Sequence, residues 1–388
     1  MDLISFQRLG DMLLRYQPYW AIQPMQLQWP ADLPDALKNA LQALSLADCA
    51  AIDSDATVQA AWFAGWLPDV LAAQPEVTTY QGTQPQWPFW LSNDIPGRKW
   101  QQIVLFADAT AKADIPALEW CAGKGHLGRL IAYSQRRQVL SLEWQQSLCE
   151  AGAAKALQLG VAQQFRQIDV LTEPVAEFFS ADQQWLALHA CGDLHRVGLQ
   201  QAIANRCQAI ALLPCCYHLQ QASHYQPQSR AGQTSGLLLD KAALRLAVQQ
   251  TCTGGERVRR LSQTEMLWRQ LWRLWAQQQG RSYQPLRSVG KHWFSGPLSA
   301  FTEFAAQQHQ LAVPTAVQLA DLLPLAEQAL LQQRQLELLQ HLFRRPLELW
   351  LVLDMALALQ DAGYQFSVQQ LCDDSLTPRN LLLQGWLA

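Results

Sequence analysis

At 388 residues the chain is long enough for two or three domains of about 150 residues each. Hydrophobic residues make up 49% of it, charged residues only 16%, and the formal net charge is −3. This balance excludes intrinsic disorder, and it provides no global basic field of the kind that indicates nucleic-acid binding. Nine scattered cysteines, an odd number, indicate reduced thiols in a cytoplasmic protein rather than a disulfide framework.

Neither a targeting segment nor a membrane segment is expected. The N-terminus carries Asp2, Arg8 and Asp11 where a signal peptide needs an uninterrupted apolar core. The most apolar later stretch is interrupted by Glu348 and Asp354 and is too short to cross a bilayer. We therefore expect a soluble protein of the cytoplasm, whose oligomeric state does not follow from its sequence.

The spacing of apolar residues divides the chain into three parts. Residues 1–94 are acidic and show helical spacing with breaks at Trp and Pro, which predicts a helical N-terminal region. From residue 95 to 218 a helix is followed by short apolar runs that alternate with helical segments, and this predicts a parallel sheet with five strands between Ile115 and Pro214. Within residues 219–345 the alternation stops, and a basic and a Gln-rich stretch predict a helical insertion.

Residues 346–388 return to the α/β pattern. Pro346 suits the first turn of a helix that ends near Asp361, with Gly363 just beyond it. Two strand candidates follow, joined by a turn-rich connector at 373–378. Because a helix and a terminal hairpin close the sheet of a class I methyltransferase, residues 95–218 and 346–388 are predicted to form that α/β (Rossmann-like) core with its mixed sheet.

The motif richest in information is EWCAGKGHLG, residues 119–128, between a predicted strand and a predicted helix. Gly123, Gly125 and Gly128 satisfy the pattern GxGxxG, whose glycines let the backbone approach a nucleotide-like ligand closely. The helix that follows presents free N–H groups to the same ligand.

Acidic residues end the next two predicted strands. Glu143 can accept both ribose hydroxyl protons of an adenosine, and Trp144 after it offers an aromatic face to the adenine. Asp169, at the end of the third strand, is placed to reach the adenine amino group.

Two cofactors, S-adenosylmethionine and a dinucleotide, share this adenosine recognition. Glu119 lies before the loop, where a carboxylate suits a methionine ammonium but repels a pyrophosphate. Nothing basic beyond Lys124 is available to neutralise phosphates, so S-adenosylmethionine is favoured and an NAD-dependent oxidoreductase is the alternative. The predicted cofactor contacts are Glu119, Cys121, Gly123, Gly125, His126, Glu143, Trp144, Asp169, Val170 and His189.

The fourth and fifth predicted strands end in LHACGDL (188–194) and LPCCYH (213–218). Ligands of open α/β sheets lie outside the carboxyl ends of the strands, so these two segments should flank the transferred methyl group. We predict that His189, Asp193, Cys215 and His218 are catalytic, with a histidine or the aspartate removing a proton from the acceptor.

The same segments allow two other interpretations. Cys215, Cys216 and His218, with Cys191 or His189, are residues of the type that binds zinc. Adjacent cysteines on a strand point to opposite faces, however, and neither CxxC pairs nor a second cluster are present, so no metal is predicted. Buried cysteines also serve as small hydrophobic core residues.

A family resemblance rests on CAGKGHLGRLIA, LHACGDL, LPCCYH and the terminal SLTPRNLLL. These segments resemble the methyltransferase domain of methyltransferase-like protein 25 and its relatives, and a similar domain of the glutathione S-transferase C-terminal-domain-containing protein. The resemblance covers about residues 94–218 and 345–388, and Arg98 and Lys99 match a basic segment before the domain. It implies a class I fold that uses S-adenosylmethionine, with Glu119, Gly123, Gly125, Glu143 and Asp169 as contacts, although Cys121 replaces the first glycine of the commoner ExGxGxG pattern.

The acceptor and the insertion are less defined. A comparable Cys-Cys-His arrangement in some tRNA ribose methyltransferases favours an RNA acceptor, with protein as the second choice. Trp268, Trp272 and Trp275 share one helix face, which is typical of core residues, although tryptophans beside arginines can also stack on bases. A non-catalytic binding scaffold on the same fold is the third hypothesis.

Overall fold

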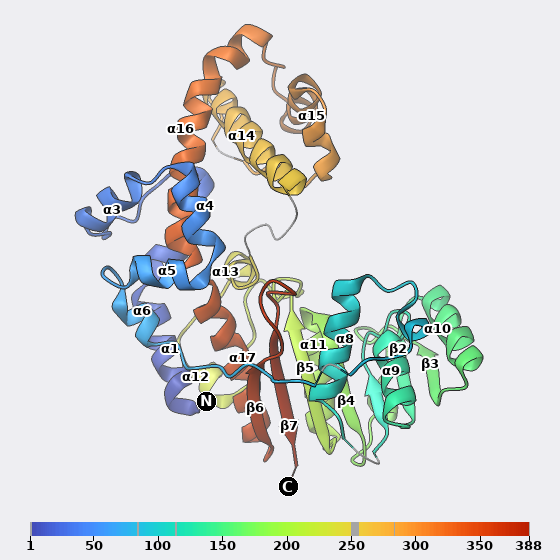
Figure 1. Ribbon diagram of the computed structural model, residues 1–388. Helices are drawn as coiled ribbons and strands as arrows, with labels where there is room; N and C mark the ends of the chain where they lie inside the picture. Colours follow the sequence, from blue (N-terminus) through green and yellow to red (C-terminus); the bar gives the residue numbers. More distant parts are fainter. Residues whose placement is uncertain (1, 84, 113–114, 250–255, 283, 388) are drawn as a thin grey trace. The chain divides into compact units, whose positions relative to one another are not determined.

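The computed structural model describes residues 2–83, 85–112, 115–249, 256–282 and 284–387. The chain divides into two compact units, coloured by sequence in Figure 1. The first consists of Met1–Leu14, Ala72–Val248 and Arg344–Ala388, and the second of Arg15–Leu71 and Gln249–Phe343.

The first unit is built on one seven-stranded sheet with the order β3-β2-β1-β4-β5-β7-β6. Its strands are β1 (Ala117–Glu119), β2 (Val139–Glu143), β3 (Gln163–Gln167), β4 (Gln184–Cys191), β5 (Ala209–Cys215), β6 (Gln365–Gln370) and β7 (Leu381–Trp386). The first five are parallel, whereas β7 runs antiparallel to both β5 and β6. The predicted fold class, a mixed sheet closed by a terminal hairpin, is confirmed.

Helices pack on both faces of this sheet. On one face, α8 (Gly97–Ala109) and α9 (His126–Ser134) share a hydrophobic core with Leu186 of β4. Side chains alternate along a strand, so the neighbouring Trp185 points to the other face, where it lies against Gly198 of α11 (Asp193–Ala204). The other helices of the unit are α1 (Leu3–Arg15), α7 (Phe89–Ser92), α10 (Gln146–Leu159), η2 (Ala176–Phe178), α12 (Arg230–Thr234), α13 (Lys241–Leu246) and α17 (Arg344–Asp361).

Helix α17 is buried nearly all round, from Pro346 to Leu359. Its Asp354 accepts hydrogen bonds from the hydroxyls of Tyr225 (2.9 Å) and Ser229 (2.6 Å) and from the backbone N–H groups of Gln228 (2.7 Å) and Ser229 (3.1 Å). A buried carboxylate is tolerated only when it is satisfied in this way, so these contacts join 225–229 to the helix. Among the described residues, no helix combines the length and the apolar character that crossing a bilayer requires.

The chain passes from one unit to the other after Leu14, Leu71, Val248 and Phe343, so the predicted boundaries at 94 and 219 differ from the observed ones, whereas that at 345 lies within two residues. Part of the N-terminal region belongs with the sheet: Phe6 stacks on Trp350, with ring centroids 5.0 Å apart, and Tyr80 N–H donates to Gln370 O of β6 at 2.7 Å. Residues 219–248 of the expected insertion belong to the sheet unit as well.

The second unit is helical. Its elements are α2 (Gln17–Trp20), η1 (Pro24–Gln26), α3 (Asp35–Gln42), α4 (Leu46–Ser54), α5 (Ala56–Phe63), α6 (Pro68–Ala72, which ends at the boundary), α14 (Glu256–Gln278), η3 (Lys291–Ser295), α15 (Leu298–His309) and α16 (Ala316–His341). The glutamines of α16 satisfy chain carbonyls: Gln335 donates to Gln42 O and Leu44 O, and Gln340 donates to Trp20 O and Ile22 O. These two glutamines of α16 therefore satisfy backbone carbonyl groups of residues 20–44.

The tryptophan face of α14 forms part of the core of this second unit. Trp272 and Trp275 are buried, and their indole N–H groups donate to His309 Nδ1 (3.0 Å) and to Ala312 O (2.9 Å). Trp268 packs on Phe294. The interpretation of these tryptophans as core residues is confirmed, and stacking on bases by Trp272 and Trp275 is excluded by their burial.

Candidate functional site

The candidate site lies at the carboxyl ends of β1, β2, β4 and β5, where open parallel sheets bind ligands. The chain leaves β1 bonded to both neighbouring strands, because Trp120 N–H donates to Leu186 O and Ala122 N–H to Leu142 O, each at 2.9 Å. Gly125 N–H then donates to Ala122 O at 2.9 Å and closes the turn that starts α9. The loop 120–125 is thereby held above the sheet edge.

The three glycines of the motif serve different purposes. A Cβ on Gly125 would lie 2.3 Å from Phe165 Cζ, and one on Gly128 would lie 2.4 Å from Glu119 Oε2, so both glycines let α9 pack onto the sheet. Gly123 has φ +59° and nothing within 4 Å of the position that a Cβ would take. Of the three, Gly123 is the one whose backbone is open to a ligand.

Glu119 points into the protein. Only 3% of the residue is exposed, and its Oε2 accepts hydrogen bonds from Ser141 Oγ at 2.6 Å and Gln163 Nε2 at 3.5 Å. Burial raises the pKa of Glu119 to about 7, although the hydrogen bonds from Ser141 and the Gly128 backbone oppose this rise. This position beneath α9 favours a structural role over the predicted contact with a cofactor ammonium.

Glu143, at the end of β2, underlies the open part of the loop. Its Oε2 accepts the N–H of Gly123 at 2.8 Å, and its Oε1 accepts the N–H of Gln145 at 3.1 Å. A carboxylate has about four lone-pair positions, so two are not used by these hydrogen bonds, although only 6% of the residue is exposed. The structure therefore brings the predicted ribose contact and the open glycine together.

The other predicted adenosine contacts follow β2 and β3. Trp144 is 62% exposed, as a residue that stacks on a base must be, while Val170 is buried. Asp169 is partly exposed, and its Oδ1 accepts the N–H of Leu171 at 3.1 Å. Ile168 N–H donates to Glu143 O at 3.0 Å, which keeps the two acidic strand ends adjacent.

Cys121 of the loop and His126, the first residue of α9, are electrically neutral. Cys121 has φ +54°, and burial together with the charges of Glu143 and Asp169 raises its pKa well above the usual range. Burial and the charge of Arg129 lower the pKa of His126 to about 4, and its Nδ1 lies 3.0 Å from Arg129 Nη1. At neutral pH the loop thus carries an uncharged thiol, and α9 begins with an uncharged imidazole.

His189 lies in a bulge of β4, where the register with β5 shifts between Leu188 and Cys191. Its φ is +60°, an uncommon value that bulges near functional sites adopt. Its Nε2 lies 2.7 Å from Gln102 Oε1, and Gln102 Nε2 donates to Leu376 O at 3.4 Å. This orientation of the amide makes Nε2 of His189 the donor and leaves Nδ1 as the acceptor.

The pKa of His189 is lowered to about 4 by burial first, then by the charges of Arg379 and Lys99. The imidazole is therefore neutral above about pH 5 and can accept a hydrogen bond from a substrate. A base with so low a pKa is weak, however, which favours a role in positioning the acceptor over full proton removal.

Asp193, the first residue of α11, has both carboxylate oxygens engaged within the protein. Oδ1 accepts from Arg196 Nε at 2.9 Å, and Oδ2 accepts the N–H of Gln221 at 2.7 Å. The residue is buried, so these contacts hold the segment after β5 against α11. This arrangement favours a structural role over the predicted catalytic one.

At the end of β5, Cys215 Sγ lies 3.1 Å from Cys191 Sγ. Hydrogen bonding to Cys191 and Cys216, together with burial, raises the pKa of the Cys215 thiol, so it is not prepared to act as a nucleophile. His218 is partly exposed, its Nδ1 is buried without a hydrogen-bond partner among the described residues, and burial lowers its pKa.

Three residues near His189 were not predicted to be in the site. Gln102 carried no signal in the sequence, because a single amide on a helix has no motif. Lys99 and Arg379 lie in the two segments, before and at the end of the domain, that carried the family resemblance, and their charges act on the pKa of His189.

Comparison with known proteins identifies a domain in one part of the chain. Residues 98–223 match a family model described as "Methyltransferase domain", whereas a comparison with curated proteins finds no match. This part of the chain is a methyltransferase domain, which supports the predicted enzyme class and S-adenosylmethionine as its cofactor.

Solved structures with similarity to the chain include coclaurine N-methyltransferase bound to N-methylheliamine and SAH (10% identity, 55% of this chain and 58% of that chain, TM-score 0.27). Another is geranyl diphosphate C-methyltransferase from Streptomyces coelicolor (12% identity, 48% of this chain and 66% of that chain, TM-score 0.26). The chain thus spans about three fifths of the length of the structures it matches.

Proposed function

We propose that this protein transfers a methyl group from S-adenosylmethionine to an RNA acceptor. The observation that carries the cofactor part of the proposal is the pairing of Gly123 with Glu143. The glycine offers an open backbone, and the carboxylate that holds its N–H keeps two lone-pair positions for a ribose. Trp144 and Asp169, at the ends of the neighbouring strands, supply an exposed ring and a carboxylate for the adenine.

A dinucleotide fits the same edge less well. The antiparallel β7 lies between β5 and β6, whereas the dinucleotide fold continues with a parallel strand at that position. An acidic group directly beneath the glycine loop also disfavours a pyrophosphate, and a cationic sulfonium gains from it.

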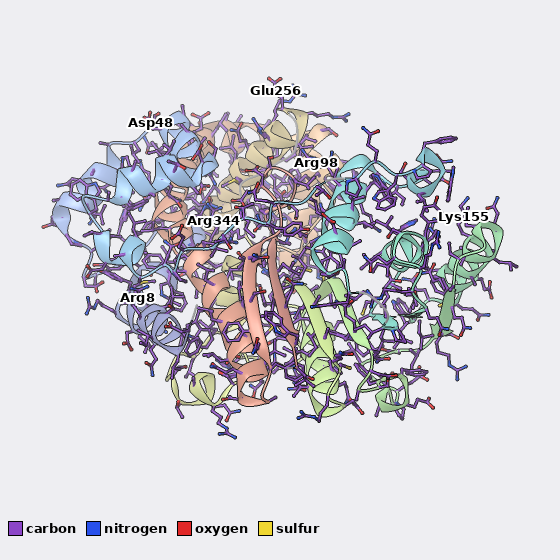
Figure 2. All side chains as sticks on the ribbon, turned by 60° about the horizontal axis from the view of Figure 1, so that its bottom comes forward. Arg8, Asp48, Arg98, Lys155, Glu256 and Arg344 are labelled. Carbon is purple, nitrogen blue, oxygen red and sulfur yellow. The ribbon has the colours of Figure 1, made fainter. Side chains whose placement is uncertain are left out.

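RNA is favoured as the acceptor because the positive charges of basic residues from three elements act on His189 of β4 and on His218, which follows β5. Lys99 of α8 and Arg379 of the β6–β7 connection both act on the pKa of His189, and Arg245 of α13 acts with Arg379 on that of His218. Arg98, next to Lys99, is exposed at the start of α8 (Figure 2). A group of basic residues of this kind suits phosphates. The resemblance to the domain of methyltransferase-like protein 25 belongs to the same proposal.

In the proposed reaction, an acceptor atom forms a bond to the methyl carbon while the carbon–sulfur bond breaks, and S-adenosylhomocysteine leaves. Positioning within about 3–3.5 Å supplies about 7–11 kcal/mol of such a displacement. The Nδ1 of neutral His189, fixed through Gln102, would accept a hydrogen bond from the acceptor and orient it. The proton of the acceptor then passes to solvent.

Calorimetric titration with S-adenosylmethionine tests the cofactor site. Glu143→Ala removes both the ribose acceptor and the partner of Gly123, so its affinity should fall at least tenfold, about 1.4 kcal/mol. Glu150→Ala, an exposed carboxylate of α10, is the matched control and should bind like the wild type. Equal affinity of the wild type and Glu143→Ala would remove the ribose contact, and stabilisation by NAD but not by S-adenosylhomocysteine would favour the oxidoreductase.

The acceptor is tested by incubating the protein and cofactor carrying a labelled methyl group with a cell lysate, followed by RNase or protease. Label lost on RNase treatment supports RNA, and label lost only on protease treatment replaces it by protein. Lys99→Glu should reduce labelling of RNA much more than cofactor affinity, because Lys99 is exposed at the start of α8. Absence of label with normal cofactor binding would support the non-catalytic scaffold.

A further inference from the structure

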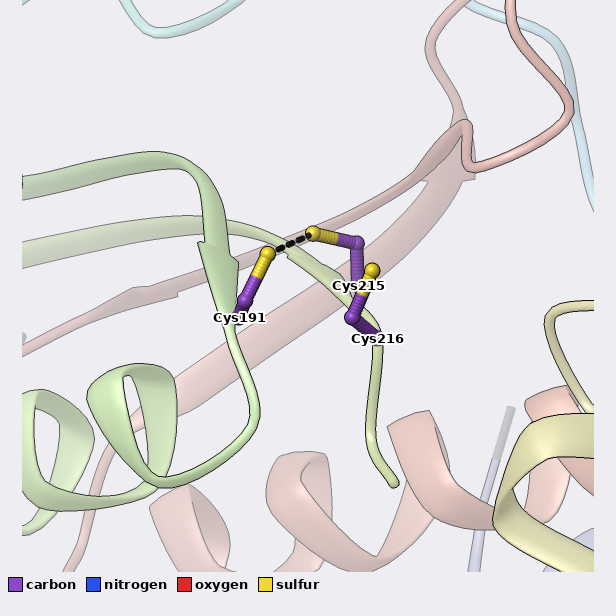
Figure 3. Close-up of side chains that lie close together, drawn as sticks. All are labelled: Cys191, Cys215 and Cys216. Carbon is purple, nitrogen blue, oxygen red and sulfur yellow. Dashed lines mark hydrogen bonds between the residues drawn. The ribbon is translucent and has the colours of Figure 1, made fainter. Parts of the chain in front are cut away.

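Three cysteine sulfurs converge where β4 and β5 end. The Sγ atoms of Cys191, Cys215 and Cys216 all lie within 4.8 Å of one another. Figure 3 shows the side chains of Cys191 and Cys215 pointing toward each other, with the sulfur of Cys216 beside them. Cys215 is 3% exposed, while the other two are partly exposed, so the cluster lies at the edge of the core.

Two irregularities of the backbone bring the sulfurs together. The bulge at His189 shifts the register of β4 so that Cys191 pairs with Cys215 instead of lying one residue out of step. β5 ends at Cys215, and Cys216 has φ +47°, which turns its side chain away from the face that strand alternation would give it. The expectation that adjacent cysteines point to opposite faces, which argued against a metal, is therefore wrong here.

We infer that Cys191, Cys215 and Cys216 bind one Zn²⁺ ion through their sulfurs, with the fourth tetrahedral position left to a water molecule or another small ligand. Thiolates are the ligands that Zn²⁺ prefers, and three protein ligands with one open position are typical of reactive zinc sites. Among the described residues, no further His, Cys, Asp or Glu side chain joins this cluster. The inference does not depend on methyl transfer.

The geometry requires only small adjustments. Zn–S bonds of about 2.3 Å at tetrahedral angles place sulfurs about 3.8 Å apart. Cys191 and Cys215 thus need to separate by about 0.7 Å from their 3.1 Å contact, which a small side-chain rotation achieves. Three thiol protons pass to the solvent as the Zn–S bonds form, and no electrons are transferred. The positive charge of Arg379, which acts on Cys216, offsets the negative charge of a zinc ion with three thiolates.

The test measures zinc in the full chain purified under argon with a reductant, by elemental mass spectrometry. Wild type should carry about one zinc per chain. Each of Cys191→Ser, Cys215→Ser and Cys216→Ser should lose most of it. Cys49→Ser, a buried cysteine of the second unit, is the matched control and should retain the metal.

A titration of the wild-type chain with Co²⁺ tests the same site without any variant, in case a serine variant fails to fold. Wild-type protein stripped with a chelator and titrated with Co²⁺ should develop intense thiolate-to-cobalt charge-transfer absorption together with the visible bands of tetrahedral cobalt, and zinc should displace both. Zinc retained in all variants, or cobalt bound without thiolate absorption, would overturn the site. A wild-type chain without zinc would also overturn the site; if protein kept without reductant is then lighter by two hydrogens, and this loss disappears in Cys191→Ser and Cys215→Ser but not in Cys49→Ser, the two sulfurs form a disulfide instead. Because the readouts are metal content and spectra, they are independent of cofactor affinity.

Discussion

The buried carboxyl of Glu119 should make the stability of the sheet unit depend on pH. Its pKa is about 7 in the folded chain against 4.5 when unfolded, because burial disfavours the ionised form. Between these values the folded state holds a proton that the unfolded state has released. The free energy of unfolding therefore falls as the pH rises from 4.5 to 7, and the full loss is present above pH 7.

The substitution Glu119→Gln isolates this effect. A pKa that rises from 4.5 to about 7 corresponds, at 1.36 kcal/mol per pH unit, to about 3 kcal/mol. The amide cannot ionise, and its oxygen can still accept from Ser141 Oγ. Any free-energy cost of placing the NH₂ group of the amide in this buried position does not depend on pH. The unfolding free energy of the variant relative to the wild type should thus rise by about 3 kcal/mol between pH 4.5 and 8.

Urea unfolding of both proteins at half-unit steps of pH, followed by tryptophan fluorescence, measures this difference. Glu150→Gln, on the exposed face of α10, should show no such slope. A relative stability of Glu119→Gln that stays constant within about 0.5 kcal/mol would refute the placement of a carboxyl with a raised pKa beneath α9. Since the carboxyl faces Ser141 rather than the open loop, cofactor affinity should change much less than in Glu143→Ala.

Three further outcomes follow from contacts in the sheet unit. Gly128→Ala places a Cβ 2.4 Å from Glu119 Oε2 and should cost about 1–3 kcal/mol in urea unfolding, whereas Gly97→Ala, with open space around it, should be neutral. Asp354→Ala removes the acceptor of four hydrogen bonds, three of them buried, and should cost about 3–5 kcal/mol, since each buried donor left without an acceptor costs about 1–3 kcal/mol; a loss below 1 kcal/mol would contradict that network. If His189 orients the acceptor while neutral, methyl transfer should decline only as the pH falls toward 4, and a midpoint near 6.5 in the rate profile would show that its pKa is not lowered.

Local sequence patterns determined most of the sheet unit. Five alternating strands and helices between Ile115 and Pro214, and a helix with a terminal hairpin after residue 345, are features that apolar spacing and turn residues specify over short distances. The order of Glu143, Trp144 and Asp169 after successive strands also followed from the sequence, because parallel strands end at one edge of the sheet. That these three residues follow strands at one edge of the sheet was therefore predictable before the structure.

Only the tertiary structure decided which side chains face that edge and which are used by the core. The periodicity of apolar residues predicts that Glu119 ends a strand. The direction in which its side chain points, however, depends on Ser141 and Gln163 of two other strands. Strand alternation separates Cys215 from Cys216, yet a positive φ at Cys216 and a bulge in β4 bring three sulfurs together. A positive φ at a residue other than glycine is strained and persists because the surrounding packing enforces it. No local pattern in the sequence therefore predicts it.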